Sequence, residues 1–395
     1  IVEDETISYR HLVRSGYGDP QLTAPSPEVT VVYTDEDFYD EYEVYPLRRV
    51  DLATIITRLS AMGASVIGVD MLLDFNSAYN EDPTLVDAIE AAGNVLLVSQ
   101  AEISDDAGYQ KTNFAIPKFS DVAESGYSNI SSNSDLAETM VRLRIHPDVA
   151  ERDNGWPFAV KALSMHVGEA PSLQNHQLFI GDEMVAQLDQ HNDLYLEYPS
   201  LPRTLDSAGN RARHEVEGIA AGDILFVDEE ELEDLSYLVD GKIVLIGEVA
   251  EVAHDQFETP AGNIFGVNII ASEIGTLLKG GPLRAASLTV ESLIAALLLV
   301  VILGTSFIAA PLIRNGISLL GAVVFIGFCF WAYAIQGLII SMVPNIIAVV
   351  LSVILVNGRF YLNEMGQKAY IKDAFGQYLS PTVVADLVKD PDKLT

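Results

Sequence analysis

Three stretches near the C-terminal end of the chain are long enough and apolar enough to cross a lipid bilayer. They read LTVESLIAALLLVVILGTSFIAA (288–310), ISLLGAVVFIGFCFWAYAI (317–335) and LIISMVPNIIAVVLSVILV (338–356). Glu291 is their one charged residue. About 20 apolar residues span the hydrocarbon core of a bilayer, and buried helices of a soluble core do not account for three such runs in succession. Residues 284–356 are therefore predicted to form an all-α membrane domain of three helices, with a kink and a polar contact at Pro344 and Asn345 in the third.

Basic residues around these spans predict their orientation. Arg314 lies in the connector between the first two spans. After the third span come Arg359, Lys368 and Lys372. Cytoplasmic loops carry an excess of Lys and Arg, so this side is expected to be cytoplasmic, in a multi-pass protein embedded in the lipid of the plasma (inner) membrane. Residues 1–284 are then extracytoplasmic, which also predicts an anchor or signal segment before Ile1.

The negative charge of the chain is confined to the part before the spans. The formal net charge is −33, and residues 285–395 carry six basic and six acidic residues, so residues 1–284 account for all of it. Such a surface repels nucleic acid and anionic lipid headgroups, and no nucleic-acid partner is expected. The single cysteine, Cys329, lies in an apolar run and cannot form a disulfide within the chain.

Residues 1–283 are predicted to form an α/β domain, because strand-like and helix-like stretches alternate from residue 29 onward. Strands are expected at 29–35, 65–73, 94–100 and 241–249, helices at 50–63, 83–93, 155–168 and 263–281, and antiparallel strands within 176–199. The helical stretches show apolar spacing of three and four residues, and several end at Gly. This alternation favours a mainly parallel sheet with helices on both faces.

Few residues of this domain offer chemistry. No Gly-rich phosphate loop follows a strand, and the seven His show no HExxH or close pairing. The remaining candidates are Asp70 and Asp74 in GVDMLLDF, at the C-terminal end of a predicted strand. Open parallel sheets bind ligands at that end, although a strand-end Asp also serves as a turn or helix cap.

Several segments of this domain resemble one known family. GASVIGVDMLLDF, PTLVDAIEAAGNVLLV, WPFAVKALSM and GKIVLIGEVAEVAHDQFETPAGNIFGVNIIASEIGTLLKG together resemble the CHASE type 2 domain, an extracytoplasmic sensor of bacterial transmembrane receptors. The resemblance covers about residues 29–283. Relatives carry cyclase, histidine kinase, Ser/Thr kinase or diguanylate cyclase output domains. The resemblance thus implies a receptor for an unknown extracytoplasmic ligand.

The resemblance also points to residues for a ligand site. YPLRR at 45–49 matches Pro46 and Arg49 of the family's Trp-Pro-Trp-Pro-Arg-like element, with both Trp replaced and Arg48 in place of the second Pro. The family's Asp-x-Phe-x-Thr-Pro loop matches at Asp255, Phe257, Thr259 and Pro260. Together with the strand-end aspartates, these matches predict one ligand-binding cleft at the carboxyl edge of the sheet. Its expected residues are Arg49, Asp70, Asp74 and Asp255.

Residues 357–379 keep helical spacing without membrane hydrophobicity. One apolar stripe runs through Leu362, Met365 and Ala369. A second, out of phase with the first, runs through Ile371, Phe375 and Tyr378. This pattern predicts a cytoplasmic signalling helix that forms a coiled coil with a phase break, and a helix lying on the membrane is the alternative.

The last residues, FGQYLSPTVVADLVKDPDKLT, resemble the segment that precedes the catalytic domain of class III adenylate/guanylate cyclases. The matching transducer residues are Phe375, Tyr378, Leu379, Ser380 and Pro381, so residues 380–395 are interpreted as a cyclase transducer element. The resemblance implies a homodimeric receptor adenylate cyclase that converts ATP to cyclic AMP, with Mg²⁺ or Mn²⁺ in a catalytic domain beyond Thr395. No catalytic residue, metal or cofactor is expected within this chain. The alternative is the input half of a CHASE-type receptor kinase.

Overall fold

The computed structural model describes residues 2–104, 108–128, 141–153, 155–199 and 218–376. The chain divides into two compact units. The first holds residues 1–285 and 330–339 and is called the α/β unit. The second holds residues 286–329 and 340–395 and is called the helical unit.

A seven-stranded sheet forms the centre of the α/β unit. Across the sheet its strands are β11 (Gly218–Ala220), β1 (Val29–Thr34), β12 (Ile243–Glu248), β2 (Val66–Val69), β3 (Val95–Ser104) and β4 (Gly108–Asn113), with β5 (Glu124–Tyr127) also paired to β3. Every pair in this sheet is parallel except β3 with β4. The central strands are mostly apolar and are buried on both faces along most of their length, as is typical of parallel sheets. The predicted mainly parallel sheet is confirmed.

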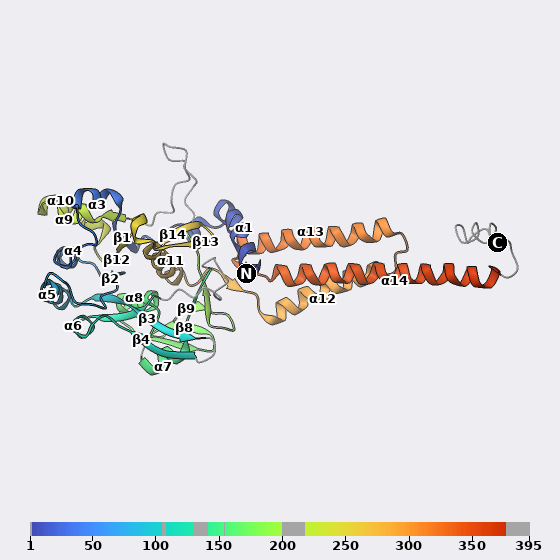
Figure 1. The fold of residues 1–395 in the computed structure, drawn as a ribbon, viewed down its shortest axis with the longest axis horizontal. Helices are drawn as coiled ribbons and strands as arrows, with labels where there is room; N and C mark the ends of the chain where they lie inside the picture. The colour runs from blue at the N-terminus through green and yellow to red at the C-terminus, as the bar shows by residue number, and fades with distance from the viewer. Residues whose placement is uncertain (1, 105–107, 129–140, 154, 200–217, 377–395) are drawn as a thin grey trace. The chain divides into compact units, whose positions relative to one another are not determined.

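Helices cover both faces of this sheet, as predicted (Figure 1). On one face lie α4 (Arg49–Ala61), α5 (Asp82–Ala92) and α9 (Ala221–Leu225), and on the other lie α8 (Phe158–Val167) and α11 (Gly266–Leu278). Alternate strand residues feed the two cores: Val31 packs in the core with α8 and α11, and Val32 packs in the core with α4 and α5. The two-residue periodicity of a strand therefore builds two separate hydrophobic cores from one sheet.

Antiparallel strands lie apart from the central sheet, as the sequence predicts for residues 176–199. A three-stranded sheet contains β7 (Pro171–Gln174), β8 (Gln177–Ile180) and β9 (Glu183–Gln187), and β10 (Asp193–Tyr195) pairs with β6 (Arg142–Arg144). A further hairpin joins β13 (Gln256–Thr259) and β14 (Gly262–Phe265). The expected helix 263–281 therefore begins later, at Gly266, because its first residues complete this hairpin.

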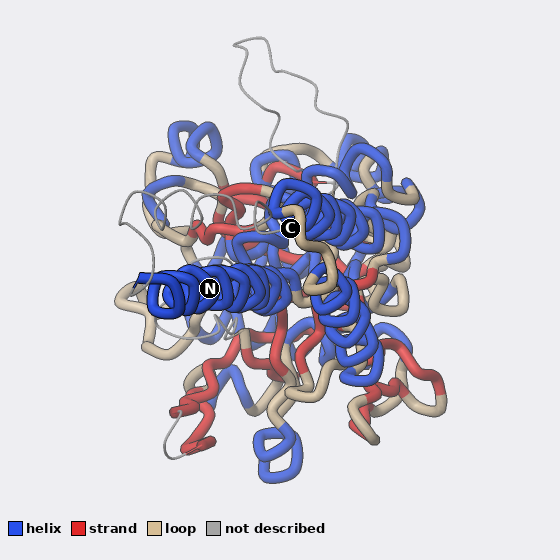
Figure 2. The backbone as a smooth tube through the Cα atoms, turned by 90° about the vertical axis from the view of Figure 1, so that its right-hand side faces the viewer, coloured by secondary structure: helices blue, strands red, loops and turns tan. Residues whose placement is uncertain are grey.

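An N-terminal helix, α1 (Val2–Tyr17), lies within the predicted domain 1–283 and precedes residues 29–283, whose motifs carry the family resemblance. The shorter elements of this unit are α2 (Pro20–Thr23), α3 (Glu36–Tyr42), α6 (Pro117–Ser120), α7 (Pro147–Asp153), α10 (Glu229–Asp234), two 3₁₀ turns (Ser236–Leu238 and Glu251–Ala253), β15 (Arg284–Ala285) and β16 (Leu338–Ile339). Figure 2 shows the strands of the chain in red and its helices in blue. β15 lies before the first predicted span and β16 lies after the second. The two strands form a parallel pair within the α/β unit.

Three long helices carry the predicted spans: α12 (Leu288–Thr305), α13 (Pro311–Gln336) and α14 (Met342–Gly376). All three are long and apolar enough to cross a membrane. The expected kink at Pro344 is wrong, because Pro344 lies in the first turn of α14, where a missing N–H breaks no helical hydrogen bond. The expected polar contact is present, since the Asn345 side chain donates to Ser341 O at 2.7 Å.

The third span and the predicted signalling helix are one element. Helix α14 runs without interruption through residue 356 to Gly376. Near this boundary Arg314, at the start of α13, donates to the Asn357 side chain at 2.7 Å and lies over the ring of Phe360 at 4.0 Å. The helix is therefore continuous from the membrane-spanning sequence to Phe375, the first of the expected transducer residues.

Candidate functional site

A cavity of about 690 Å³ opens at the carboxyl ends of β2 and β12. Its wall comes from parts of the chain that are distant in sequence: residues 44–52 before and in the first turns of α4, residues 70–81 after β2, and the end of β12 with the turn that follows it. Val98 and Gln100 of β3 and Ser128, just after β5, complete the wall. Ligands of open α/β sheets bind at this edge, and the volume suits a small organic molecule. We call this cavity the sensor pocket.

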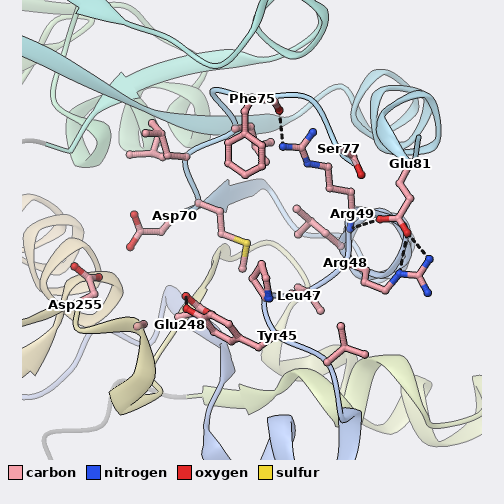
Figure 3. Close-up of a pocket in the computed structure, with 18 of the residues that line it drawn as sticks. Tyr45, Leu47, Arg48, Arg49, Asp70, Phe75, Ser77, Glu81, Glu248 and Asp255 are labelled. Carbon is pink, nitrogen blue, oxygen red and sulfur yellow. Dashed lines mark hydrogen bonds and ion pairs between the residues drawn. The ribbon is translucent and has the colours of Figure 1, made fainter. Parts of the chain in front are cut away.

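Asp70 lies at one end of the sensor pocket, where β2 stops (Figure 3). Its backbone N–H still follows the sheet, because it donates to Ile246 O at 2.9 Å. The carboxyl is partly buried and makes no hydrogen bond or ion pair within the described part of the chain. Burial, followed by the charges of Asp255 and Glu248, raises the pKa of Asp70 to about 7. Asp70 therefore changes protonation near neutral pH.

Asp255 faces the same end of the pocket from the turn before β13. Its carboxyl lies against Gly266, the first residue of α11, and a Cβ at that position would collide with Asp255 Oδ2. Burial raises the pKa of Asp255, and a hydrogen bond from the Gly266 backbone acts in the opposite direction. A helix N-terminus stabilises a carboxylate, so α11 favours the ionised form of Asp255.

Glu248, the last residue of β12, is the third carboxylate at this end. Its two oxygens accept hydrogen bonds from the hydroxyls of Tyr39 and Tyr45, the latter at 3.5 Å. Burial and the contact with Glu248 raise the pKa of both tyrosines, which thus remain neutral donors. Glu248 is therefore hydrogen-bonded without being neutralised.

Two arginines line the opposite end of the pocket, and their guanidinium groups are occupied by the protein itself (Figure 3). Arg49 pairs with Asp82, donates to Phe75 O at 2.6 Å, and stacks over the Phe75 ring at 5.0 Å. Arg48 donates to Glu81 through Nε at 2.8 Å. These arginines hold the loop 70–81 against the start of α4.

The structure thus brings together three of the four residues that the sequence assigned to one cleft. Arg49, Asp70 and Asp255 line the sensor pocket. Asp74 is exposed and is not part of the pocket wall. The placement says where these side chains lie, and their role in binding a ligand remains a prediction.

A smaller cavity of about 230 Å³ adjoins the same carboxylates. It is lined by Asp70, Gln100, Ser128, Asp255, Phe257, Gly266 and Ile270. Glu273 follows Gly266 and Ile270 on the same face of α11, since helix positions i, i+4 and i+7 align. It is only 2% exposed, and its Oε1 has no hydrogen-bond partner among the described residues. Burial, with the nearby charge of Asp70, raises the pKa of Glu273 to about 8.

Sequence reasoning missed Glu248, Glu273 and the two tyrosines. Glu248 ends a predicted strand, so the rule that selected Asp70 would also have selected it. Glu273 and Tyr39 lie on helices where polar residues are ordinary surface positions, and only the packed fold shows that they are enclosed.

The remaining predictions concern metals and the transducer. Among the described residues, no group of three His, Cys, Asp or Glu is arranged to hold a metal ion. Phe375 lies in the last turns of α14. Tyr378, Leu379, Ser380 and Pro381 fall outside the described residues, so the transducer role stays a prediction.

Comparison with known proteins identifies one family. The family model of the CHASE2 domain matches residues 5–310, a longer region than the sequence motifs indicated, because it includes most of α1 and all of α12. Searches of curated proteins and of solved structures gave no match.

Proposed function

The chain belongs to the CHASE2 domain family, a family of receptor sensor domains, and from this premise we propose that it is the input half of a bacterial receptor adenylate cyclase. The observation that carries the proposal is the sensor pocket of about 690 Å³, placed at the carboxyl edge of the sheet in a chain with three membrane-spanning candidates. In this proposal a ligand enters the pocket outside the cell, and the helices carry the change to a cyclase domain inside.

The proposed orientation is supported by the basic residues of the helical unit. Arg314 lies near the start of α13, and Arg359 and Lys368 lie in the part of α14 that extends past the apolar sequence. Charge asymmetry of this kind favours a cytoplasmic location for that side and supports the proposal that the α/β unit lies outside. In this orientation the acidic α/β unit also avoids the anionic inner leaflet.

The orientation is tested by cysteine labelling. Asp74→Cys, at an exposed position, should react with a membrane-impermeant maleimide on intact cells, whereas Lys368→Cys should react only after permeabilisation. The native Cys329 is buried and supplies the background. Labelling of Lys368→Cys on intact cells would contradict the proposed sidedness.

The cyclase output is supported by the resemblance of the last residues to a cyclase transducer element and by the continuity of α14. In this proposal a movement of the third span is transmitted along one helix as far as Gly376. Leu362 and Met365 remain 68% and 51% exposed on α14, beyond the third predicted span, and we propose that this stripe pairs with α14 of a second copy. Class III catalysis, with Mg²⁺ or Mn²⁺ and ATP, would then occur between two such chains.

The output is tested by expressing the intact coding sequence in a bacterial host that lacks its own adenylate cyclase. Cyclic AMP should accumulate, and Ser380→Ala or Pro381→Ala should change basal or stimulated synthesis while membrane insertion is retained. A receptor kinase, the alternative, would transfer radioactive phosphate from ATP to protein and produce no cyclic AMP.

The sensor role of the pocket is tested in the same cells. Met71 lines the pocket and is only partly buried, so Met71→Trp should reduce the cavity volume without opening the core. We expect this substitution to alter cyclic AMP synthesis, and Asp74→Asn, at an exposed site outside the pocket, to leave it unchanged. Equal output from wild type and Met71→Trp under all growth conditions would remove the pocket from the signalling scheme.

A further inference from the structure

We infer that the sensor pocket takes a small organic cation, such as a protonated amine, whose positive group sits between Asp70 and Asp255 and whose apolar part lies along the pocket wall. The inference rests on the proposed sensor function, because it names the ligand class of the same pocket. Three observations support it. They are the unpaired negative charges in the pocket wall, the second cavity beside the acidic end formed by Asp70, Glu248 and Asp255, and the size and apolar lining of the pocket.

The charge inventory leaves an excess of negative groups. The two cations of the wall, Arg48 and Arg49, each have an acidic partner in Glu81 and Asp82, and Lys118 adds a second cation to Asp82 at 2.8 Å. At that end of the pocket three cations and two carboxylates thus pair with one another, and neither carboxylate is left without a cation. At the other end, Asp70, Glu248 and Asp255 form no ion pair with any described residue (Figure 3). An incoming anion is repelled there, and a cation is attracted.

The acidic end extends into the protein beyond the surface carboxylates. Asp70 and Asp255 also line the smaller cavity of about 230 Å³, and the almost fully buried Glu273 follows that cavity's residues along the same face of α11. An oxygen of Glu273 lacks a hydrogen-bond donor within the described chain. Carboxyls that are buried together without a donor are costly, and a donor from outside that sits between Asp70 and Asp255 would reduce that cost. An ammonium group supplies three N–H donors together with the positive charge.

The size and walls of the cavity favour an organic cation over a bare metal ion. A metal ion needs several carboxylates at coordination distance, and the described residues contain no such group of three. The cavity is instead large, and its lining includes Leu47, Met71 and Leu72, with the aromatic ring of Tyr45 beside the acidic end. Aliphatic and aromatic walls bind an apolar body, and an aromatic face also attracts a cation.

Protonation of the acidic end sets the pH dependence of binding. Asp70 faces Asp255 from the turn before β13, Glu248 from β12 and, deeper in the protein, Glu273 from α11. Burial, followed by the charges of Asp255 and Glu248, raises the pKa of Asp70, and Asp70 in turn raises the pKa of Glu273. A bound cation acts in the opposite direction, because it favours the ionised form of Asp70. Affinity for the cation should therefore fall as the pH decreases from 8 to 6, through the pKa of Asp70 at about 7.

The test uses the full chain purified in detergent and four probes of similar size: benzylammonium, cyclohexylammonium, benzyl alcohol and benzoate. Binding is measured by calorimetry at constant ionic strength at pH 8. We expect the two ammonium ions to bind about tenfold or more tightly than benzyl alcohol, a difference of about 1.4 kcal/mol, and benzoate to bind most weakly. Asp70→Asn should weaken ammonium binding about tenfold, and the matched control Asp74→Asn should leave it unchanged.

Several outcomes overturn the inference. These are equal affinity for benzyl alcohol and the ammonium ions, tighter binding of benzoate, no saturable binding of either ammonium ion, or unchanged affinity in Asp70→Asn. Cyclic AMP measurements keep this failure separate from failure of the proposed function. If Met71→Trp alters cyclic AMP synthesis but ammonium ions do not bind, the pocket is a sensor for another class of ligand. If ammonium ions bind in an Asp70-dependent manner and no cyclic AMP is made, the output assignment fails and the ligand class stands.

Discussion

Two groups of charged side chains inside the α/β unit differ in whether their charges are paired within the protein. Arg14 and Glu197, each about 1% exposed, form an ion pair at 2.7 Å, and Arg14 also donates to Tyr333 O and Ala334 O at 3.0 and 3.1 Å. We call this the closed pair. At the sensor pocket, Asp70, Glu248 and Asp255 lack a cationic partner among the described residues, and we call these three the open cluster. Their negative charge is still available to a molecule from outside, whereas the closed pair has none left to offer.

The position of the closed pair explains why its two charges are paired. Arg14 lies on α1, Glu197 follows β10, and Tyr333 lies near the end of α13, so the pair joins three segments of the α/β unit that are far apart in sequence. A small apolar cluster of Ile7, Val141, Leu283, Tyr333 and Ile339 accompanies it. Because these groups are removed from water, every charge and hydrogen-bond donor that is left unpaired would be costly. The closed pair is thus a structural connection between α1 and the residues next to the spans.

The largest expected effect comes from breaking the closed pair. Arg14→Met or Glu197→Gln each leaves one buried charged group unpaired, and we expect each to lower the free energy of unfolding of the α/β unit by about 3–5 kcal/mol. The measurement is urea unfolding of the full chain in detergent, followed by Trp156 fluorescence in a Trp331→Phe background. The double variant Arg14→Met/Glu197→Met should recover part of the loss, because apolar side chains replace both charges. Single variants with nearly wild-type stability would show that the pair contributes nothing to the fold.

A smaller effect, with the opposite sign, is expected at the open cluster. The pKa of Asp70 is raised to about 7 in the folded protein from an ordinary value near 4, so the folded state binds this proton more tightly than the unfolded state. The associated stability is fully present below about pH 4 and is lost as the pH rises through 7. Asp70→Asn should remove this loss and stabilise the protein at pH 8 by about 1–2 kcal/mol, after allowance for partial solvent screening.

The stability of Asp70→Asn is compared with that of Asp74→Asn by the same urea unfolding at pH 6 and pH 8. The gap between Asp70→Asn and the wild type should widen with pH, and the exposed Asp74 should give parallel curves. Saturating benzylammonium should close the gap, because the bound cation stabilises the ionised form of Asp70 in the folded protein. A constant gap at the two pH values would mean that Asp70 is protonated no more readily in the folded protein than in the unfolded chain.

The contrast between elements held by apolar packing and elements held by paired charges also explains which parts of the fold the sequence predicted. Apolar β-branched runs and 3.6-residue spacing located the central strands and helices, because those elements bury hydrocarbon. Helix α1 was not predicted, because its buried face is largely polar. The stripe at helical spacing consists of Asp4, Ile7, Arg10, His11 and Arg14, all at most 5% exposed. Hydrophobic periodicity does not find a helix whose inner face is held by ion pairs such as that of Arg142 with Asp4 at 2.5 Å.

The candidate site was predicted in part for a related reason. Strand-end position selected Asp70, and the family loop selected Asp255, because both signals are local in the sequence. The ion pair of Arg49 with Asp82 joins residues far apart in sequence, and no local pattern indicates it. Sequence reasoning therefore expected Arg49 to be available to a ligand, whereas the structure shows it paired. Only the fold distinguishes a charge that is reserved for a ligand from one that is already paired.

The smallest effect is expected at Glu248, which is intermediate between the closed pair and the open cluster because Tyr39 donates a neutral hydrogen bond to it. Tyr39→Phe keeps the ring contacts with Phe38 and Tyr45 and removes only the hydroxyl. Loss of the hydroxyl's hydrogen bond to the partly exposed Glu248, and of its longer contact with Thr34 Oγ1 at 3.4 Å, should lower the free energy of unfolding by about 1 kcal/mol at pH 8. Benzylammonium affinity should stay within about twofold, because the substitution changes no charge in the pocket. A loss of affinity as large as that of Asp70→Asn would mean that the tyrosine hydroxyl, and with it hydrogen bonding in place of charge, governs the choice of ligand.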